Sequence, residues 1–347
     1  MKKIKAFTLA SIFILVFVVL AGCQSKSAPS NQGNQANTTQ SQTGNQSETP
    51  KATSNEEYVM VSNVAGHPYW LDAQDGGRDA AAELGVKWTY TGPSDFNTAA
   101  QVTTLEQIIA KKPAGIIVAA LQPDALTPAI NKAVEAGIPV VTVDTDAPAS
   151  KRMTYLGTDN YQAGRVMGER LAQVVNGNGN IGLATVPGQF NLEERIRGIK
   201  DVLLQKYPNV KVASIVDDKN DDSATATAVV AMLQANPDIK AVASINAVGA
   251  GVAAALRQAN KVGQVKAVTF DITDPILNGI EDGTIDSTIV QRTYMMTYLG
   301  VKLLYNYNHR SKYLDNWFQN KLNILPNAVD TGVMVITKDQ ARAFKRK

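Results

Sequence analysis

The stretch AGIIVAALQPDALTPAINKAVEAGIPVVTVDT, residues 114–145, decides the fold. Its apolar start, 114–120, predicts a strand. The amphipathic segment 124–136 predicts a helix that ends at Gly137, and the apolar run 139–145 predicts a second strand. Neither strand alternates apolar with polar residues, which is typical of strands covered on both faces in a parallel sheet. The stretch therefore predicts a right-handed β-α-β unit.

The same alternation of strands and helices extends on both sides of this unit. Before it, we expect strands over 58–64 and 86–91 and helices over 67–84 and 98–111. After Asp159 the rhythm restarts, with expected helices over 161–175, 192–207, 223–235, 248–259 and 275–281 and expected strands over 181–186, 210–216, 241–245 and 265–270. Two α/β halves of similar length predict an α/β protein of two doubly wound parallel-sheet domains.

The N-terminus has the pattern of a lipoprotein signal. Three lysines precede an apolar run over 7–20, which ends in Leu20-Ala21-Gly22-Cys23, and Cys23 is the single cysteine of the chain. This end resembles bacterial lipoproteins, in which such a cysteine becomes the lipidated first residue. We predict a signal peptide over 1–22 and an extracytoplasmic protein anchored by lipid to the outer face of the cytoplasmic membrane. An ordinary signal peptide or anchor with an incidental cysteine is the alternative.

Composition limits the partners of the remaining chain. Residues 23–56 are rich in Ser, Asn, Gln and Thr and predict a disordered polar tether after the lipidated cysteine. Without the three signal-peptide lysines, the 34 basic residues fall to 31, equal to the 31 acidic residues. A neutral chain argues against nucleic acid as a partner.

Sequence motifs of enzymes and cofactors are missing or misplaced. Gly177-x-Gly179-x-x-Gly182 has the spacing of a dinucleotide fingerprint, but it follows an expected helix and leads into an expected strand, whereas the fingerprint needs the reverse order. It predicts a helix end and a turn. No Walker loop or Gly-x-Ser-x-Gly elbow occurs, and the two histidines, His67 and His309, give poor support for a metal site. We expect neither catalysis nor a cofactor.

Polar and aromatic side chains recur where the expected strands end, which is where open α/β sheets bind ligands. These residues are His67, Tyr69, Trp70, Asp144, Arg195, Asn246, Asp271 and Gln291. Rings can stack on the C–H faces of a sugar, while carboxylates, amides and a guanidinium can bind its hydroxyl groups. The set predicts a site for a small neutral sugar or polyol.

Each of these residues also has a structural explanation. Tyr69 and Trp70 could be core residues, and Asp144 or Asp271 could cap a helix N-terminus. Arg195 could form a surface ion pair with Glu193 or Glu194, and neither Asn246 nor Gln291 alone favours either explanation. Their repeated position at strand ends favours the binding site.

The folded part resembles the type I periplasmic sugar-binding proteins of ABC importers, in the ribose-binding branch. The similarity covers about 57–338 and rests on one ordered set: His67-Pro68-Tyr69-Trp70, Val143-Asp144, Thr158-Asp159-Asn160, Arg195-x-x-Gly198, Asn246, Phe270-Asp271 and Gln291. The resemblance implies two lobes joined by a hinge of three crossings that close on a sugar. The N-terminal lobe would comprise 57–158 plus about 292–328, and the C-terminal lobe 159–291 plus about 329–347.

The resemblance also implies which residues hold the ligand. His67, Tyr69, Trp70 and Asp144 would come from the first lobe, Arg195, Asn220, Asn246 and Asp271 from the second, and Gln291 from near the hinge. Three positions depart from the ribose-binding pattern: Thr145 replaces an Arg, Asn220 an aromatic residue and Ala119 an Asn. These changes argue against ribose itself.

We therefore expect a monomeric solute-binding lipoprotein that captures a sugar or polyol by lobe closure and delivers it to the membrane subunits of an ABC permease. A receptor for a sensor kinase or chemoreceptor is the alternative, since the same site would serve it. An autoinducer-2-binding relative ranks lower, because its second-lobe Asp-Gln pair is missing near 191–195. A repressor of this fold would need a helix-turn-helix where the lipid signal and tether stand.

Overall fold

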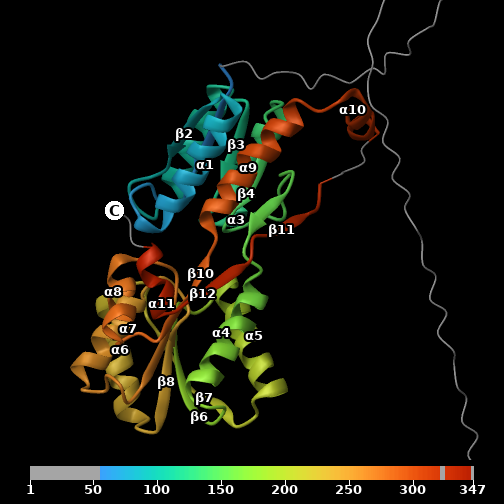
Figure 1. Ribbon diagram of the computed structural model, residues 1–347. Coiled ribbons are helices and arrows are strands. Elements are labelled where there is room, and N and C mark those ends of the chain that lie inside the picture. The colour runs from blue at the N-terminus through green and yellow to red at the C-terminus, as the bar shows by residue number, and fades with distance from the viewer. Residues whose placement is uncertain (1–54, 321–324, 345–347) are drawn as a thin grey trace, which may run out of the picture. The chain divides into compact units, whose positions relative to one another are not determined.

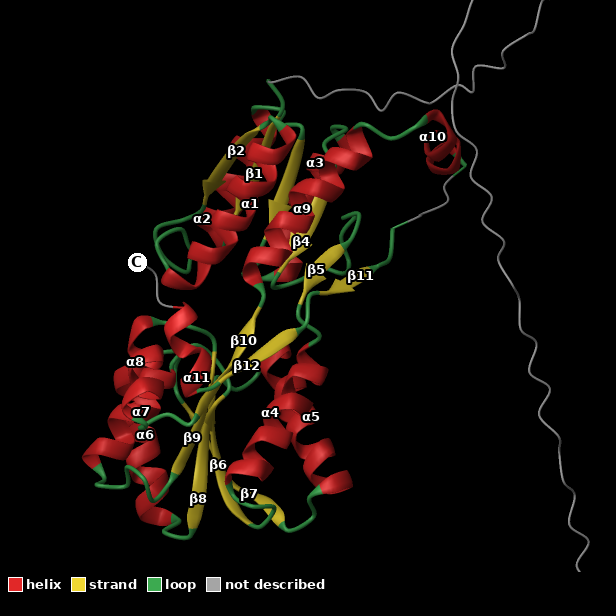
Figure 2. Ribbon diagram, viewed as in Figure 1, coloured by secondary structure: helices red, strands yellow, loops and turns green. Residues whose placement is uncertain are grey.

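The computed structural model describes residues 55–320 and 325–344, so the signal peptide, Cys23 and nearly all of the tether lie outside the described residues. The described chain contains two six-stranded sheets, each covered by helices on both faces (Figures 1 and 2). The predicted α/β class with two doubly wound lobes is confirmed. No helix within the described ranges is long and apolar enough to cross a membrane.

The first sheet is entirely parallel, with strand order β11-β5-β4-β3-β1-β2. Its strands are β1 (Glu57–Val61), β2 (Lys87–Thr91), β3 (Gly115–Val118), β4 (Val140–Val143), β5 (Tyr155–Gly157) and β11 (Ala328–Asp330). Every residue of β3 and β4 is buried, as continuous apolar runs require. Helices α1 (Leu71–Leu84) and α9 (Thr293–Asn308) pack on one face, and α2 (Thr98–Ala110) and α3 (Pro123–Glu135) on the other.

The second sheet has the order β12-β10-β9-β8-β6-β7. Its parallel strands are β6 (Gly179–Thr185), β7 (Val210–Asp217), β8 (Ile239–Ser244), β9 (Lys266–Phe270) and β10 (Ser287–Gln291), while β12 (Val333–Ile336) is antiparallel to β10. Helices α4 (Asn160–Val174) and α5 (Phe190–Lys206) cover one face. Helices α6 (Asp222–Ala235), α7 (Gly249–Gln258) and α8 (Asp274–Asp282) cover the other, where the short α11 (Lys338–Ala341) and η2 (Arg342–Phe344) join them. Helix α10 (Lys312–Gln319) follows α9 in the sequence.

The chain passes between the two sheets three times: from β5 to α4, from β10 to α9, and from β11 to β12. Two of these crossings are bonded to each other. The Thr331 amide donates to the carbonyl oxygen of Gly157 (2.8 Å), and the Asp159 amide donates to a carboxylate oxygen of Asp330 (3.0 Å). The last crossing turns at Gly332, whose φ of +70° suits glycine.

The glycines at 177, 179 and 182 end a helix and begin a strand, as predicted. Gly177, with a φ of +71°, follows α4 and donates its amide to the carbonyl oxygen of Ala172 (2.8 Å). Strand β6 then begins at Gly179. A dinucleotide fingerprint needs the opposite order of strand and helix, so this motif belongs to the fold and not to a cofactor site.

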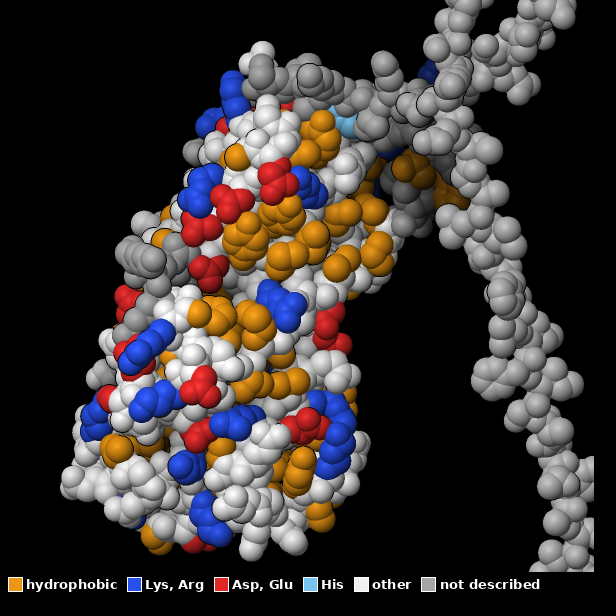
Figure 3. Space-filling model, in the orientation of Figure 1, with side chains coloured by type: hydrophobic (Ala, Val, Ile, Leu, Met, Phe, Trp, Pro, Cys, Tyr) orange, Lys and Arg blue, Asp and Glu red, His pale blue; other side chains and the backbone are white. Residues whose placement is uncertain are grey.

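Charged side chains of both signs are interspersed over the face shown in Figure 3, where no broad region carries one sign alone. A surface of this kind gives no electrostatic footprint for a polyanion on that face.

Candidate functional site

Asp144 begins the site in the first lobe, directly after β4. Its φ of +60° lies in the left-handed region, which costs energy for a residue with a Cβ. Two bonds hold it there: its amide donates to the carbonyl oxygen of Leu156 (3.2 Å), and its own carbonyl oxygen accepts from the Tyr155 hydroxyl (2.7 Å). No helix follows Asp144 before β5, so its interpretation as a helix cap is wrong.

Tyr69 reaches this carboxylate from the short 3-10 turn η1 (Pro68–Trp70). Its hydroxyl donates to Asp144 Oδ1, while the Thr145 hydroxyl donates to Oδ2 (3.2 Å). His67 caps the turn, since its Nδ1 accepts from the Tyr69 amide (3.2 Å). The predicted helix over 67–84 thus starts as this turn, and α1 begins only at Leu71.

Trp70 points into the core of the first lobe. It is 2% exposed, and its Nε1 donates to Asn63 Oδ1 (3.0 Å). The rings of Trp70 and Tyr69 pack edge to face, with 4.9 Å between their centroids. Trp70 is therefore a core residue, whereas the side chain of Tyr69 projects toward Asp144.

Asp271 occupies the matching position in the second lobe, directly after β9. Its φ is +64°, its amide donates to the carbonyl oxygen of Ile289 (2.8 Å), and its carbonyl oxygen accepts from the Thr288 hydroxyl (2.8 Å). Helix α8, which follows, is capped by Thr273, so Asp271 is not a helix cap either. Both aspartates are therefore held at strand ends by neighbouring strands.

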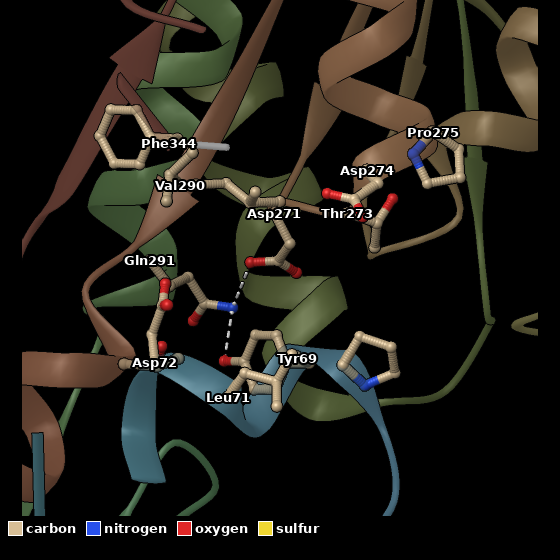
Figure 4. A pocket seen from close by; sticks show the side chains of 13 residues that line it. Tyr69, Leu71, Asp72, Asp271, Thr273, Asp274, Pro275, Val290, Gln291 and Phe344 are labelled. Atoms are coloured by element: carbon tan, nitrogen blue, oxygen red, sulfur yellow. Dashed lines mark hydrogen bonds between the residues drawn. The ribbon is translucent and has the colours of Figure 1, made fainter. Parts of the chain in front are cut away.

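Gln291 connects the two aspartates. Its Nε2 donates to Asp271 Oδ1 (3.0 Å) and to the Tyr69 hydroxyl (3.0 Å), as the dashed lines of Figure 4 show. Because the Tyr69 hydroxyl donates to Asp144, one chain of hydrogen bonds runs Asp144–Tyr69–Gln291–Asp271. It joins side chains that are up to 222 residues apart in the sequence.

Arg195 in the first half of α5 is buried, 3% exposed. Its Nε donates to Asn160 Oδ1 (2.8 Å), its Nη1 donates to the carbonyl oxygen of Ile245 (2.9 Å), and its guanidinium lies 4.0 Å from the ring centroid of Phe270. Glu194 pairs with Arg197 instead. The interpretation of Arg195 as a surface ion pair is wrong.

A cavity of about 200 Å³ opens beside the hydrogen-bonded chain and is drawn in Figure 4. Tyr69, Asp271 and Gln291 line it, whereas the other six predicted ligand residues do not. The second lobe also contributes Ile272, Thr273, Asp274, Pro275, Val290 and Phe344 to its wall. Polar groups that converge on a partly apolar cavity are typical of a small-molecule site, and this cavity lies below the usual range of roughly 300–1,000 Å³.

A family model described as a periplasmic binding protein domain matches residues 58–310, well over half of the chain. The chain belongs to the periplasmic binding protein family. The resemblance to sugar-binding members is confirmed by several relatives. AraP, an arabinose-binding protein from Geobacillus stearothermophilus, is 38% identical with a TM-score of 0.79, over 84% of this chain and all of AraP.

Two further relatives are more distant. The xylose/arabinose-binding protein XylF of Sulfolobus acidocaldarius is 26% identical over 305 residues, which are 82% of this chain and 72% of XylF. A solute-binding protein from Burkholderia graminis, solved in complex with D-arabinose, is 30% identical with a TM-score of 0.73, over 84% of this chain and 98% of that protein.

Asn246 and Asn220, two further predicted ligand residues, both bind the carboxylate of Asp218, a residue that the sequence did not predict as part of the site. Asn246 Nδ2 donates to Asp218 Oδ1 and to Asn220 Oδ1, both at 3.2 Å, and the Asn220 amide donates to Asp218 Oδ1 (2.8 Å). Asp218 is fully buried, and its Oδ2 has no hydrogen-bond partner among the described residues. Asp218 lies directly after β7, and this position could have identified it, because other candidates also follow strands.

Burial raises the pKa of the site carboxyls. It raises the pKa of Asp271 to about 6, against the positive charge of Arg195, which acts in the opposite direction. Burial also raises the pKa of Asp144 and of Asp218, although hydrogen bonds to each act against it. No salt bridge within the described ranges joins Arg195 to Asp144 or Asp271. The charge of Arg195 and hydrogen-bond donors therefore both stabilise the charged form of Asp144 and Asp271, and the hydroxyl groups of a sugar are donors of this kind.

Within the part of the chain that the structure describes, no group of three or more His, Cys, Asp and Glu side chains is arranged to hold a metal ion.

Proposed function

We propose that this protein captures a small neutral sugar between its lobes, with a pentose such as arabinose as the first candidate. The observation that carries the proposal is the chain Asp144–Tyr69–Gln291–Asp271, which brings acceptors and donors from both lobes to one place. AraP, XylF and the Burkholderia protein all have arabinose in their names or complexes. Binding, not catalysis, is the activity, in keeping with relatives that are named as binding proteins.

The ligand would replace bonds that the protein now makes with itself. Each aspartate can accept two or more hydroxyl hydrogens, and the positive charge of Arg195 acts on both of them. Since a buried polar group that loses its partner costs about 1–3 kcal/mol, a sugar of the wrong configuration is penalised. Lobe closure around the three crossings would exclude water and strengthen these bonds.

The other ligand contacts are proposals of the same kind. His67 and Trp70 would shape the turn that presents Tyr69, as their contacts indicate. Asn220 and Asn246 would act as a pair on the second-lobe side of the ligand.

Delivery to an ABC permease and attachment through Cys23 complete the proposal. A lipid anchor followed by a polar tether keeps a receptor near a membrane transporter at a high effective concentration. We infer a monomer on the outer face of the cytoplasmic membrane. Replacing Cys23 by Ala should abolish incorporation of a labelled fatty acid into the protein while sugar affinity stays the same.

The test of the binding proposal is a thermal-shift screen of pentoses, hexoses, inositol and autoinducer-2. A sugar at 100 times its Kd should stabilise the protein by about 2.7 kcal/mol. Asp271→Ala should abolish the shift while the ligand-free protein still unfolds in one cooperative transition. If no compound shifts the melting temperature, or if Asp271→Ala responds like the wild type, the proposal is wrong.

A further inference from the structure

Each site aspartate is bonded to a hydroxyl group on the neighbouring strand, and in both lobes that strand leads into the hinge. The Tyr155 hydroxyl on β5 donates to the carbonyl oxygen of Asp144 (2.7 Å). The Thr288 hydroxyl on β10 donates to the carbonyl oxygen of Asp271 (2.8 Å). Strand β5 continues into the crossing to α4, and β10 continues into the crossing to α9. The two hydroxyls therefore connect the candidate sugar ligands with the segments that join the lobes.

The third crossing borders the same two strands on their other edge. Strand β5 lies between β4 and β11, and β10 lies between β9 and β12 (Figure 2). The third crossing joins β11 to β12. At the end of β5, the carbonyl oxygen of Gly157 accepts from both the amide (2.8 Å) and the hydroxyl (3.1 Å) of Thr331 in that crossing. In each lobe, one strand thus separates the aspartate from the third crossing and bonds to both sides.

The fold fixes both hydroxyls in place. Thr288 is fully buried, and its β-branched side chain has few rotamers to choose from. Gly157 makes room for Tyr155, because a Cβ on Gly157 would lie 2.0 Å from the tyrosine hydroxyl oxygen. Burial raises the pKa of Tyr155, so its hydroxyl keeps the proton that it donates. Since a positive φ costs energy in a residue with a Cβ, these bonds help to hold each aspartate in that conformation.

We propose that Tyr155 and Thr288 are positioning residues for sugar binding, which fasten the backbone of the two aspartates to the hinge strands. The inference rests on the proposed function. The backbone conformation of an aspartate sets the direction of its Cα–Cβ bond, and therefore where its carboxylate points. Neither Tyr155 nor Thr288 is among the described residues that line the cavity. Their effect on the sugar is therefore exerted through Asp144 and Asp271.

The test in the second lobe separates the hydroxyl of Thr288 from its shape. Thr288→Val removes the hydroxyl and keeps a β-branched side chain, whereas Thr288→Ser keeps the hydroxyl and loses the methyl group. With the sugar found in the screen, we expect calorimetry to give Thr288→Val a Kd about fivefold higher than that of the wild type, which corresponds to one neutral hydrogen bond of about 1 kcal/mol. Thr288→Ser should restore the wild-type Kd, which a purely structural threonine would not require.

Thr269→Val is the matched control. Thr269 lies directly opposite Thr288 in the pairing of β9 with β10 and is equally buried, but its hydroxyl has no hydrogen-bond partner among the described residues. Its replacement should leave the Kd at the wild-type value. In the first lobe, Tyr155→Phe removes only the hydroxyl and should raise the Kd by about fivefold for the same reason. Gly157→Ala, which displaces that hydroxyl, should raise the Kd as well, and melting curves confirm that each variant is folded.

The outcomes separate this inference from the proposed function. If the wild type binds sugar and either Tyr155→Phe or Thr288→Val binds it equally tightly, the inference is wrong and sugar binding stands. If Thr288→Ser or Thr269→Val loses as much affinity as Thr288→Val, the loss comes from altered packing and not from the hydroxyl, and the inference is again wrong. If the wild type binds no sugar in the screen, the proposed function itself fails.

Discussion

In each lobe the backbone holds an aspartate in the same conformation at a strand end, but the side chains around the two aspartates differ. Asp144 and Asp271 each follow a strand, adopt a positive φ and donate an amide proton to the next strand, and each carbonyl oxygen accepts from a hydroxyl on that strand. Asp144, however, is bonded to the hydroxyls of Tyr69 and Thr145, whereas Asp271 is bonded to the side-chain amide of Gln291. The charge of Arg195 acts on both carboxylates. The backbone of the fold thus sets the position, and neighbouring side chains set the chemistry.

In both lobes a pair of helices packs closely at a glycine. Substitution of that glycine should have the largest effect on stability. A Cβ on Gly164 in α4 would lie 2.0 Å from the Arg195 carbonyl oxygen, and one on Gly76 in α1 would lie 2.1 Å from that of Tyr294. Because backbone cannot yield easily, Gly164→Ala and Gly76→Ala should each lower the free energy of unfolding by about 2–3 kcal/mol in urea titrations.

The two glycine variants should differ in their effect on sugar binding. Gly164→Ala displaces the helix that carries Arg195 and should weaken binding, whereas Gly76→Ala displaces α9, which carries no candidate ligand residue. Gly66→Ala, where a Cβ would meet nothing within 4 Å, is the control and should change neither stability nor affinity. Equal stability of Gly164→Ala and the control would contradict the close approach.

A smaller effect follows from the pKa of Asp271, which burial raises to about 6 from the usual 3.8. A carboxyl with a raised pKa in the folded state stabilises that state fully below its unfolded pKa, and this contribution is lost as the pH rises through 6. Asp271→Asn should therefore stabilise the ligand-free protein relative to wild type at pH 7 by about 2 kcal/mol more than at pH 4, as measured by urea unfolding.

Asp217→Asn provides the comparison for that experiment, since Asp217 is an exposed carboxylate at the end of β7 in the same lobe. If the difference in unfolding free energy between Asp271→Asn and wild type does not change with pH, burial does not raise the pKa of Asp271.

The smallest predicted effect concerns Asp218, which was not among the predicted ligand residues. Asp218→Ala should weaken sugar binding by about tenfold, because Asn246 loses one of its two acceptors and the turn at Asn220 loses its bond. Asn220→Gly keeps the positive φ of 54° and should preserve the turn. If Asp218→Ala binds sugar as the wild type does, Asn246 does not need this carboxylate.

The sequence predicted most strands and helices before residue 282 because their apolar patterns are local, but it predicted neither β5 nor α9. Continuous apolar runs such as 115–118 can only be covered on both faces, and glycines such as Gly85 and Gly137, with φ values of +68° and +82°, end helices where expected. The antiparallel β12 could not be foreseen in this way, since its direction depends on a crossing that joins distant segments.

The site was predictable as a set of strand ends but not as a set of contacts. Tyr69 and Trp70 are neighbours of the same chemical type, and only the fold decides that Trp70 enters the core while Tyr69 meets Asp144. Asn160 as the partner of Arg195 and Phe344 as a wall of the cavity depend on contacts between remote segments. Asp218 was missed although its position after β7 follows the rule that found the others.

The central claim is that both aspartates, one from each lobe, hold the same sugar. Titration calorimetry of Asp144→Asn, Asp271→Asn and wild type with the sugar found in the screen tests it most directly. Each variant should lose at least about tenfold in affinity while remaining folded, since each removes a charged hydrogen-bond acceptor worth about 1.5–3 kcal/mol. Wild-type affinity in either variant would contradict a site shared by the two lobes.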